Sequence, residues 1–126
     1  MATIRTQGLD HFAVTVRDLE RSERFYRDVL GLERVFADEW AEPVMMMTAA
    51  GSGVALFQAE PGPPGERQPV RVVHVAFRVD RAMFDLARQV LPDVGLEPQF
   101  EDHGVAHSIY FPDPDGHRLE LTTYEV

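Results

Sequence analysis

Cysteine is absent from the 126-residue chain, and this absence excludes several kinds of site. Without thiols the protein has no disulfides, no thiolate metal ligands and no cysteine nucleophile. Long apolar runs are also missing, since no segment approaches the roughly 18 apolar residues of a membrane-spanning helix. Residues 1–7 lack the apolar core of a signal peptide. We therefore expect a cytoplasmic protein.

Positive charge is scarce as well. Twelve Lys and Arg stand against 21 Asp and Glu, which gives a formal net charge of −9. A chain of this charge repels phosphate backbones and anionic membranes, and no local cluster of basic residues offsets the deficit. Nucleic acid and membranes are therefore not expected partners, and a small molecule or another protein remains.

The second half of the chain repeats the pattern of the first. His11, Ala13 and Val16 in a strand over 9–16 correspond to His74, Ala76 and Val79 in a strand over 73–79. Each strand is followed by an aspartate that suits a helix N-cap. The helix over 19–30 ends at a glycine and carries an apolar stripe, and the second helix has a stripe of its own. The two expected stripes are Leu19, Ser22, Phe25 or Tyr26, Val29 and Leu30, and then Phe84, Ala87, Val90 and Leu91.

Further strands are expected over 32–36, 44–49 and 54–58 in the first half. In the second half a strand over 96–100, a polar loop over 101–106 and a hairpin over 107–123 are expected. The sequence thus predicts an α+β fold of two βαβββ modules packed as one domain. Its eight-stranded mixed sheet would curl around a metal or ligand cavity. Module one covers about 7–60, a proline-rich linker covers 61–69, and module two covers about 70–126.

The expected C-terminal hairpin carries a carboxylate in the middle of its second strand. Residues 113–116 read Asp-Pro-Asp-Gly, a strong turn signal, and Glu120 then lies between two leucines in the return strand. With the repeat-related His11 and His74, Glu120 forms the set of two imidazoles and one carboxylate that suits a divalent first-row metal. Taken singly, each histidine also fits a hydrogen-bonded buried residue, and Glu120 a solvated strand acid.

These residues resemble the vicinal oxygen chelate superfamily, which includes glyoxalase I, fosfomycin-resistance transferases, bleomycin-resistance proteins and extradiol dioxygenases. The resemblance is carried by the segments 10–19, 25–32, 73–77 and 113–121, and it spans essentially the whole chain. It implies one divalent metal ion held by His11, His74 and Glu120, with Fe(II) favoured and Mn, Zn, Ni or Co as alternatives. It also implies a small-molecule substrate and a homodimer.

The sub-family is less evident from the sequence. Glyoxalase I uses a fourth ligand from the last strand of its first module. The repeat places Phe57 at that position, and only a one-residue slip, which would reverse the faces of the strand, brings Gln58 there. We favour Phe57, which disfavours glyoxalase I. Tyr110, ten residues before Glu120, and His103 resemble the residues that line the catechol site of extradiol dioxygenases. Tyr110 also matches a tyrosine of the fosfomycin transferases.

Other features depart from each sub-family. Residues 58–73 contain no histidine where the dioxygenases carry a further acid–base histidine, and those enzymes usually have two such domains. Phe12-Ala13 follows His11 where fosfomycin transferases place a threonine. We expect a metal-dependent, extradiol-dioxygenase-like enzyme with Tyr110 and His103 as proton or hydrogen-bond partners. The alternatives are a glyoxalase I-like isomerase, a thiol transferase, and a ligand-sequestering protein of the bleomycin-resistance kind.

Overall fold

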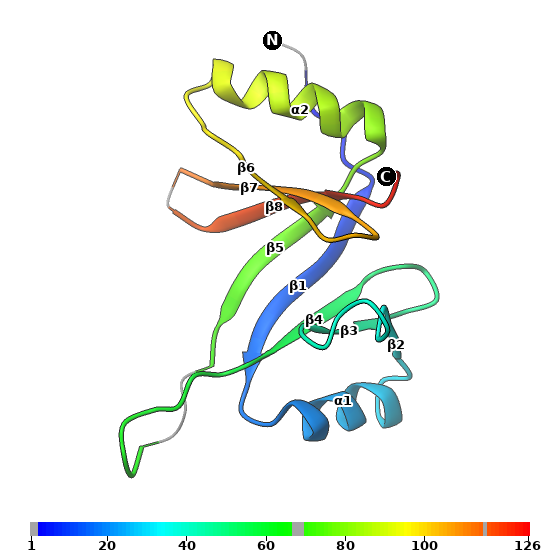
Figure 1. Cartoon of the computed structure of the whole chain (residues 1–126), viewed down its shortest axis with the longest axis vertical. Helices are drawn as coiled ribbons and strands as arrows, with labels where there is room; N and C mark the ends of the chain where they lie inside the picture. Colours follow the sequence, from blue (N-terminus) through cyan, green and yellow to red (C-terminus); the bar gives the residue numbers. More distant parts are fainter. Residues whose placement is uncertain (1–2, 67–69, 115) are drawn as a thin grey trace. The chain divides into compact units, whose positions relative to one another are not determined.

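The computed structural model describes residues 3–66, 70–114 and 116–126, and Figure 1 shows the elements along the chain. The expected turn residue Asp115 and linker residues 67–69 lie outside the described part. The first half contains β1 (Gly8–Val16), α1 (Leu19–Asp28), β2 (Glu33–Val35), β3 (Val44–Met47) and β4 (Gly53–Gln58). The second half contains β5 (Val72–Arg78), α2 (Arg81–Asp93), β6 (Gln99–Asp102), β7 (His107–Pro112) and β8 (Arg118–Thr123). The repeated βαβββ order is therefore confirmed.

The strands hydrogen-bond in the order β2-β3-β4-β1-β5-β8-β7-β6. β1 pairs with β4, and β5 with β8, in parallel, whereas β2–β3, β3–β4, β6–β7 and β7–β8 are antiparallel. The expected eight-stranded mixed sheet is thus confirmed. The chain divides into two compact units, one of residues 1–10 and 74–126 and the other of residues 11–73, so β1 and β5 contribute to both. The packing of the modules as one domain around a cavity stays a prediction.

In the unit of residues 11–73, α1 begins at Leu19 as predicted, but its last helical residue is Asp28 instead of residue 30. The Asp18 side chain accepts a hydrogen bond from Arg21 N at the N-terminus. At the other end Gly31, at φ 74°, donates to Arg27 O, which is the bond of an αL ending, and Leu32 donates to Tyr26 O.

The expected apolar stripe of α1 is partly wrong. Leu19 and Tyr26 pack on the sheet, but Phe25, Val29 and Leu30 are 51%, 64% and 56% exposed. Successive residues on a helix are about 100° apart, so seating Tyr26 on the sheet turns Phe25 toward solvent. Val29 and Leu30 follow the last helical residue and leave the contact face.

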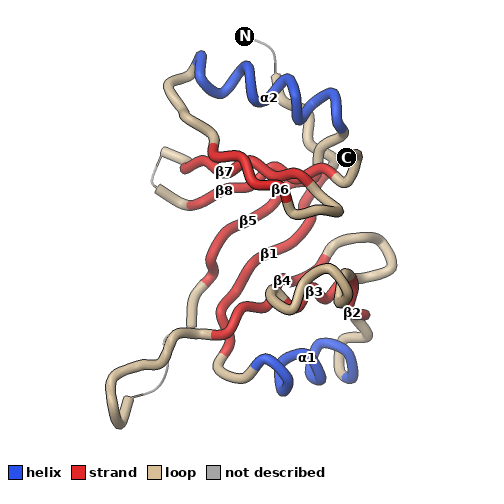
Figure 2. The backbone as a smooth tube through the Cα atoms, in the orientation of Figure 1, coloured by secondary structure: helices blue, strands red, loops and turns tan. Residues whose placement is uncertain are grey.

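The sheet of this unit has apolar side chains on both faces. Figure 2 shows the backbone of this unit, with α1 beside β2, β3 and β4. Met46 packs with Leu32, Val44 and Leu56 on the face that α1 covers. The residues on the opposite face form a second cluster, made of Ala13, Met45, Met47 and Ala55 with Trp40 and Phe57 packed against it. The alternation of the three methionines in β3 accounts for this division, and it assigns them to the core.

In the unit of residues 1–10 and 74–126, the predicted stripe of α2 is confirmed. Phe84, Ala87, Val90 and Leu91 are its buried residues, and Asp80 caps the helix through Met83 N. The core of this unit joins three of these to β7 and β8, namely Phe84, Ala87 and Leu91 with Val79, Ile109 and Leu121. Neither α1 nor α2 is long and apolar enough to cross a membrane.

Two expected boundaries in this unit need correction. The strand predicted over 96–100 begins at Gln99, because Leu96 N closes the helix on Leu91 O and Pro98 has no N–H to donate to a ladder. The segment 101–106 was expected as a loop, but Glu101 and Asp102 pair with β7 and extend β6.

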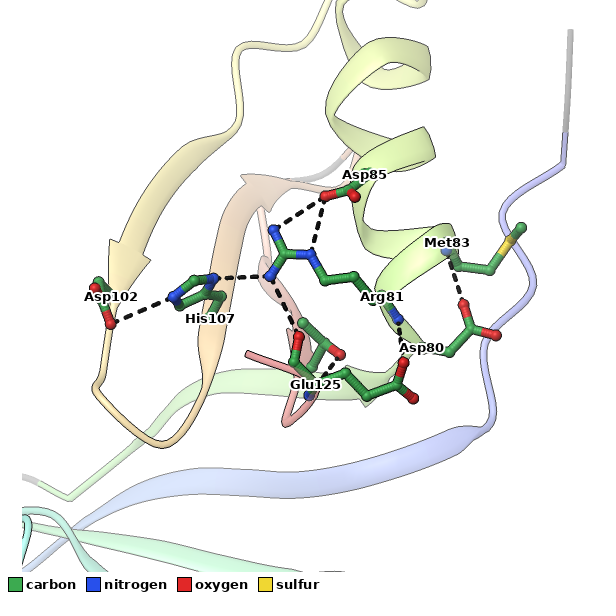
Figure 3. A network of polar contacts seen from close by, with 8 residues as sticks. Asp80, Arg81, Met83, Asp85, Asp102, His107 and Glu125 are labelled. Carbon is green, nitrogen blue, oxygen red and sulfur yellow. Dashed lines mark hydrogen bonds and ion pairs between the residues drawn. The ribbon is translucent and has the colours of Figure 1, made fainter.

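A polar network ties the chain end to the start of α2 (Figure 3). The Arg81 guanidinium contacts Asp85 Oδ1 at 3.0 Å, Glu125 O at 3.5 Å and His107 Nδ1 at 2.8 Å. A guanidinium only donates, so His107 Nδ1 accepts and the ring proton sits on Nε2, which faces Asp102 Oδ1 at 3.5 Å. This network fixes one neutral tautomer of His107 and is separate from the candidate metal ligands.

Candidate metal centre and its surroundings

The candidate residues of the unit containing residues 74–126 share one face of its sheet. Along β8 Leu121 belongs to the core under α2, so Glu120, its neighbour in the strand, projects from the other face. The register places Glu120 between Tyr110 of β7 and Ala76 of β5, and His74 lies two residues before Ala76 on the same face. Strand alternation alone therefore gathers an imidazole, a phenol and a carboxylate.

His74 and Glu120 form a close, buried pair. Nε2 of His74 lies 2.8 Å from Oε1 of Glu120, and the two side chains are 9% and 3% exposed. This distance is that of an imidazole–carboxylate hydrogen bond. It also matches the roughly 3 Å that separates two neighbouring donors on one ion when each bond is about 2.1 Å. Nitrogen and carboxylate oxygen are ligand types that divalent first-row metals accept, so this pair fits such an ion.

The second oxygen of Glu120 is engaged by a serine that the sequence did not single out. Ser108 is fully buried, and its Oγ donates to Glu120 Oε2 at 2.7 Å. Thr122 Oγ1 lies 3.2 Å from the same hydroxyl. A serine has one proton, and the shorter bond to a charged acceptor is the stronger one. The carboxylate is therefore held with Oε2 toward Ser108 and Oε1 toward His74.

The two residues predicted to take part in chemistry also meet. His103, in the loop between β6 and β7, places Nε2 3.0 Å from the Tyr110 hydroxyl, and Glu101 Oε2 lies 3.6 Å from the same nitrogen. The Tyr110 ring meets the His74 ring edge to face, with the centroids 5.5 Å apart. The imidazole and phenol therefore form a hydrogen-bonded pair beside the His74–Glu120 pair.

Burial raises the pKa of Tyr110 well above its usual range, and the negative charges of Glu120 and Glu101 add to the effect. The phenol therefore keeps its proton at neutral pH. It donates a hydrogen bond to a neutral His103, and it accepts one from a protonated His103.

A buried carboxylate immediately precedes His11. Asp10 is fully buried and accepts hydrogen bonds from Arg78 Nη2 at 2.8 Å and from the Tyr124 hydroxyl at 2.8 and 3.1 Å. The Arg78 guanidinium lies over the Tyr124 ring, 5.1 Å from its centroid. Burial lowers the pKa of Arg78, but the Asp10 hydrogen bond and charge outweigh this and leave the pKa raised. This triad fixes the first part of β1 within its own unit.

His11 begins the unit of residues 11–73 and is 6% exposed. In the β1–β4 register it stands opposite Gly53, and Thr15 stands opposite Phe57, so Phe57 shares the face of His11. Gln58 belongs to the opposite face, and its amide donates to Arg17 O at 2.8 Å and to Val16 O at 3.3 Å. The register thus agrees with the expectation that Phe57, rather than Gln58, follows the face of the first histidine.

Several residues around these side chains were not identified from the sequence. Ser108 and Arg118 each lie two residues from a predicted residue, so strand alternation offered a signal for both. Asp10 and Tyr124 offered none, because their contact joins residues 114 positions apart.

The fold and these side chains define a protein of paired βαβββ modules with a candidate His/carboxylate centre. A sequence profile of the Glyoxalase/Bleomycin resistance protein/Dioxygenase superfamily matches residues 8–121. The chain belongs to this superfamily, which confirms the resemblance seen in the sequence.

The curated relatives of this chain include fosfomycin-resistance and metallothiol transferase proteins on one side and dioxygenases on the other. The chain is 32% identical to fosfomycin resistance protein FosX from Mesorhizobium japonicum, over 93% of this chain and 86% of the relative. It is 32% identical to metallothiol transferase FosB from Staphylococcus saprophyticus, over 93% and 77%. It is 36% identical to biphenyl-2,3-diol 1,2-dioxygenase 3 from Rhodococcus globerulus, over 92% of this chain but only 63% of the dioxygenase.

Solved structures support the fold alone. The 2,3-dioxygenase LapB from Pseudomonas sp. KL28 matches with a TM-score of 0.74 and 23% identity, over 97% of this chain and 42% of LapB. Methylmalonyl-CoA epimerase from Mycobacterium tuberculosis matches with a TM-score of 0.71 and 19% identity, over 98% and 91%. The Mn(II)-bound glyoxalase from Novosphingobium aromaticivorans matches with a TM-score of 0.72 and 23% identity, over 97% and 40%.

Proposed function

We propose that this protein is a divalent-metal-dependent enzyme that acts on a small oxygenated substrate with extradiol-dioxygenase-like chemistry. His11, His74 and Glu120 would hold the ion, with Fe(II) favoured. Each of the three offers one ligand atom, an imidazole nitrogen or a carboxylate oxygen. The superfamily match and the close His74–Glu120 pair support the assignment.

The observation that carries the proposed chemistry is the hydrogen bond between His103 and Tyr110. When bound, the metal would supply a Lewis acid and a template for adjacent substrate oxygens. Tyr110 then donates a hydrogen bond to a substrate oxygen, since its raised pKa keeps the phenol protonated. His103 holds or moves a proton at the Tyr110 hydroxyl, as a general acid–base group within hydrogen-bond reach.

A thiol transferase is the second candidate. It is favoured by the FosX and FosB relatives, because the chain spans most of their length, whereas it spans less than two thirds of the biphenyl-2,3-diol dioxygenase. The shared metal ligands do not separate the two chemistries.

Metal binding is the first test. Protein purified without chelators and supplied anaerobically with Fe(II), Mn(II), Zn(II) or Ni(II) should bind one equivalent, and Glu120→Gln should bind far less. Gln58→Ala is the matched control, because the Gln58 amide donates hydrogen bonds to backbone carbonyls. A parent protein that takes up none of these ions would overturn the proposal.

Turnover separates the two candidates. Oxygen uptake with a panel of catechols supports the dioxygenase-like assignment. Loss of fosfomycin that requires both metal and an added thiol, without oxygen uptake on any catechol, would transfer the assignment to the thiol transferases.

A further inference from the structure

A small cavity lies beside Tyr110. Its volume is about 190 Å³, and its lining residues are Glu97, Gln99, Tyr110, Phe111, Pro112, Gly116 and Arg118. Cavities that enclose a whole drug-sized ligand measure about 300–1,000 Å³, so this one has room for a substituent of a ligand. Tyr110 belongs both to the cavity wall and to the His103 pair, which makes the cavity a neighbour of the candidate centre.

Arg118 supplies a cation to this cavity. It lies two residues before Glu120 in β8 and therefore projects from the same face. Its guanidinium stands over the Tyr110 ring, 4.4 Å from the centroid. A guanidinium stacked by its flat side keeps its N–H edge for oxygen acceptors.

Arg118 is one of several arginines that pair with no carboxylate in the described part of the chain, and among them it is the one that lines the cavity. Arg34, Arg78 and Arg81 each pair with a carboxylate. Within residues 3–66, 70–114 and 116–126, no carboxylate pairs with Arg118, and its contact is with the Tyr110 ring. In a chain with a net charge of −9, such a cation beside a candidate site offers the complementary charge for an anionic group.

We propose that Arg118 and Tyr110 form a subsite for an oxyanion, a carboxylate or phosphonate, carried by the small-molecule substrate. The planar fork of Arg118 binds the two oxygens, and the Tyr110 ring covers the apolar part of the substituent. Glu97 on the cavity wall opposes the anion, and because Glu97 and Arg118 are both exposed, solvent screens both charges. The role as a substrate subsite rests on the proposed function, whereas the binding of an oxyanion does not.

The test uses the full chain, with and without Zn(II), titrated with benzoate, phenylphosphonate and the neutral benzamide. Binding is followed by the amide signals of Gln99 and Tyr110 in ¹H–¹⁵N spectra. We expect an oxyanion to bind at least about tenfold more tightly than benzamide, with or without Zn(II). A tighter fit of benzoate or of phenylphosphonate identifies which oxyanion the subsite takes.

Variants assign the effect to the guanidinium. Arg118→Gln should abolish the preference over benzamide, and Arg118→Lys should keep part of it, because the charge remains without the fork. Glu97→Gln should tighten oxyanion binding a few-fold. Arg88→Gln is the matched control, since the Arg88 guanidinium lies over the Phe100 ring at 4.7 Å but does not line the cavity.

The subsite would be overturned if neither oxyanion bound, if neither bound more tightly than benzamide, or if the preference survived Arg118→Gln. Oxyanion binding that appears only with Zn(II) would also overturn it, because it would reflect direct ligation of the ion. Zn(II) uptake measured on the same samples tests the proposed function independently. Failure of the metal centre and failure of the subsite are therefore distinguishable.

Discussion

Ser108 Oγ lies 2.7 Å from Glu120 Oε2, and both side chains are buried in the β7–β8 pair. The hydroxyl fixes one carboxylate oxygen and thereby orients the other toward His74. Groups that orient a metal ligand in this way set the affinity for the ion even though they do not touch it.

Ser108→Ala should therefore weaken metal binding by about 10- to 100-fold, the usual effect of removing such a partner. Competition with a chromophoric chelator measures this affinity. Thr123→Val is the matched control, because it removes another fully buried hydroxyl, one that accepts from Glu125 N. An unchanged affinity in Ser108→Ala, alongside a loss in Glu120→Gln, would show that Ser108 does not position the ligand.

Tyr110→Phe removes the hydroxyl that meets His103 Nε2 at 3.0 Å while keeping the ring. If the pair performs acid–base work, kcat should fall by about 10²–10⁴-fold and metal affinity should stay near the parent value. His103→Gln should cause a comparable loss, and the double variant should lose little more, because the two residues act as a unit. Additive losses would contradict a shared role.

The features that could be predicted from the sequence are those that depend on residues close together along the chain. The caps at Asp18 and Asp80 are short-range signals, and both appear in the structure. The contact of His103 with Tyr110 spans seven residues within one strand pair, so hairpin register suffices to bring them together. Strand alternation likewise accounts for the shared face of Tyr110 and Glu120.

Other features depend on contacts that no short-range pattern encodes. The Asp10–Arg78 ion pair joins residues 68 positions apart, and only the folded sheet brings them together. The sequence also could not predict that Phe25 is exposed, because Phe25 and its neighbour Tyr26 fit the apolar stripe of α1 equally well.

Arg78→Met should destabilise the protein by roughly 2–3 kcal/mol, because it leaves the buried Asp10 carboxylate without its cation. The value lies below that for a fully buried pair since the Arg78 side chain is 30% exposed. Urea unfolding measures the change. Arg27→Met is the control, because its ion pairs with Glu23 and Asp28 are on the surface and should contribute less than about 1 kcal/mol. Equal effects of the two substitutions would contradict a structural role for the Asp10 pair.

Burial, strengthened by the Asp10 charge, raises the pKa of Tyr124 above its ordinary value near 10. Because the folded state holds this proton more tightly than the unfolded state, the stabilisation is complete below about pH 10 and is lost as the pH rises further. Tyr124→Phe lacks this dependence. The gap in unfolding free energy between the parent and Tyr124→Phe should therefore narrow between about pH 8 and about pH 11. A gap that stays constant or widens would show that Tyr124 does not ionise late.

Gly53 tests the close contact between β3 and β4 at the position opposite His11. A Cβ atom on Gly53 would overlap the backbone oxygen of Met46, and backbone cannot move aside as the end of a side chain can. Gly53→Ala should thus cost about 3 kcal/mol, at the upper end of the range for overpacking, and should separate the two strands. Urea unfolding gives the cost, and hydrogen exchange of Met46 and Val54 locates it. Ser52→Ala, in the adjoining turn, is the control and should cost no more than about 1 kcal/mol. A Gly53→Ala protein as stable as this control would mean that β3 and β4 lie farther apart than their register indicates.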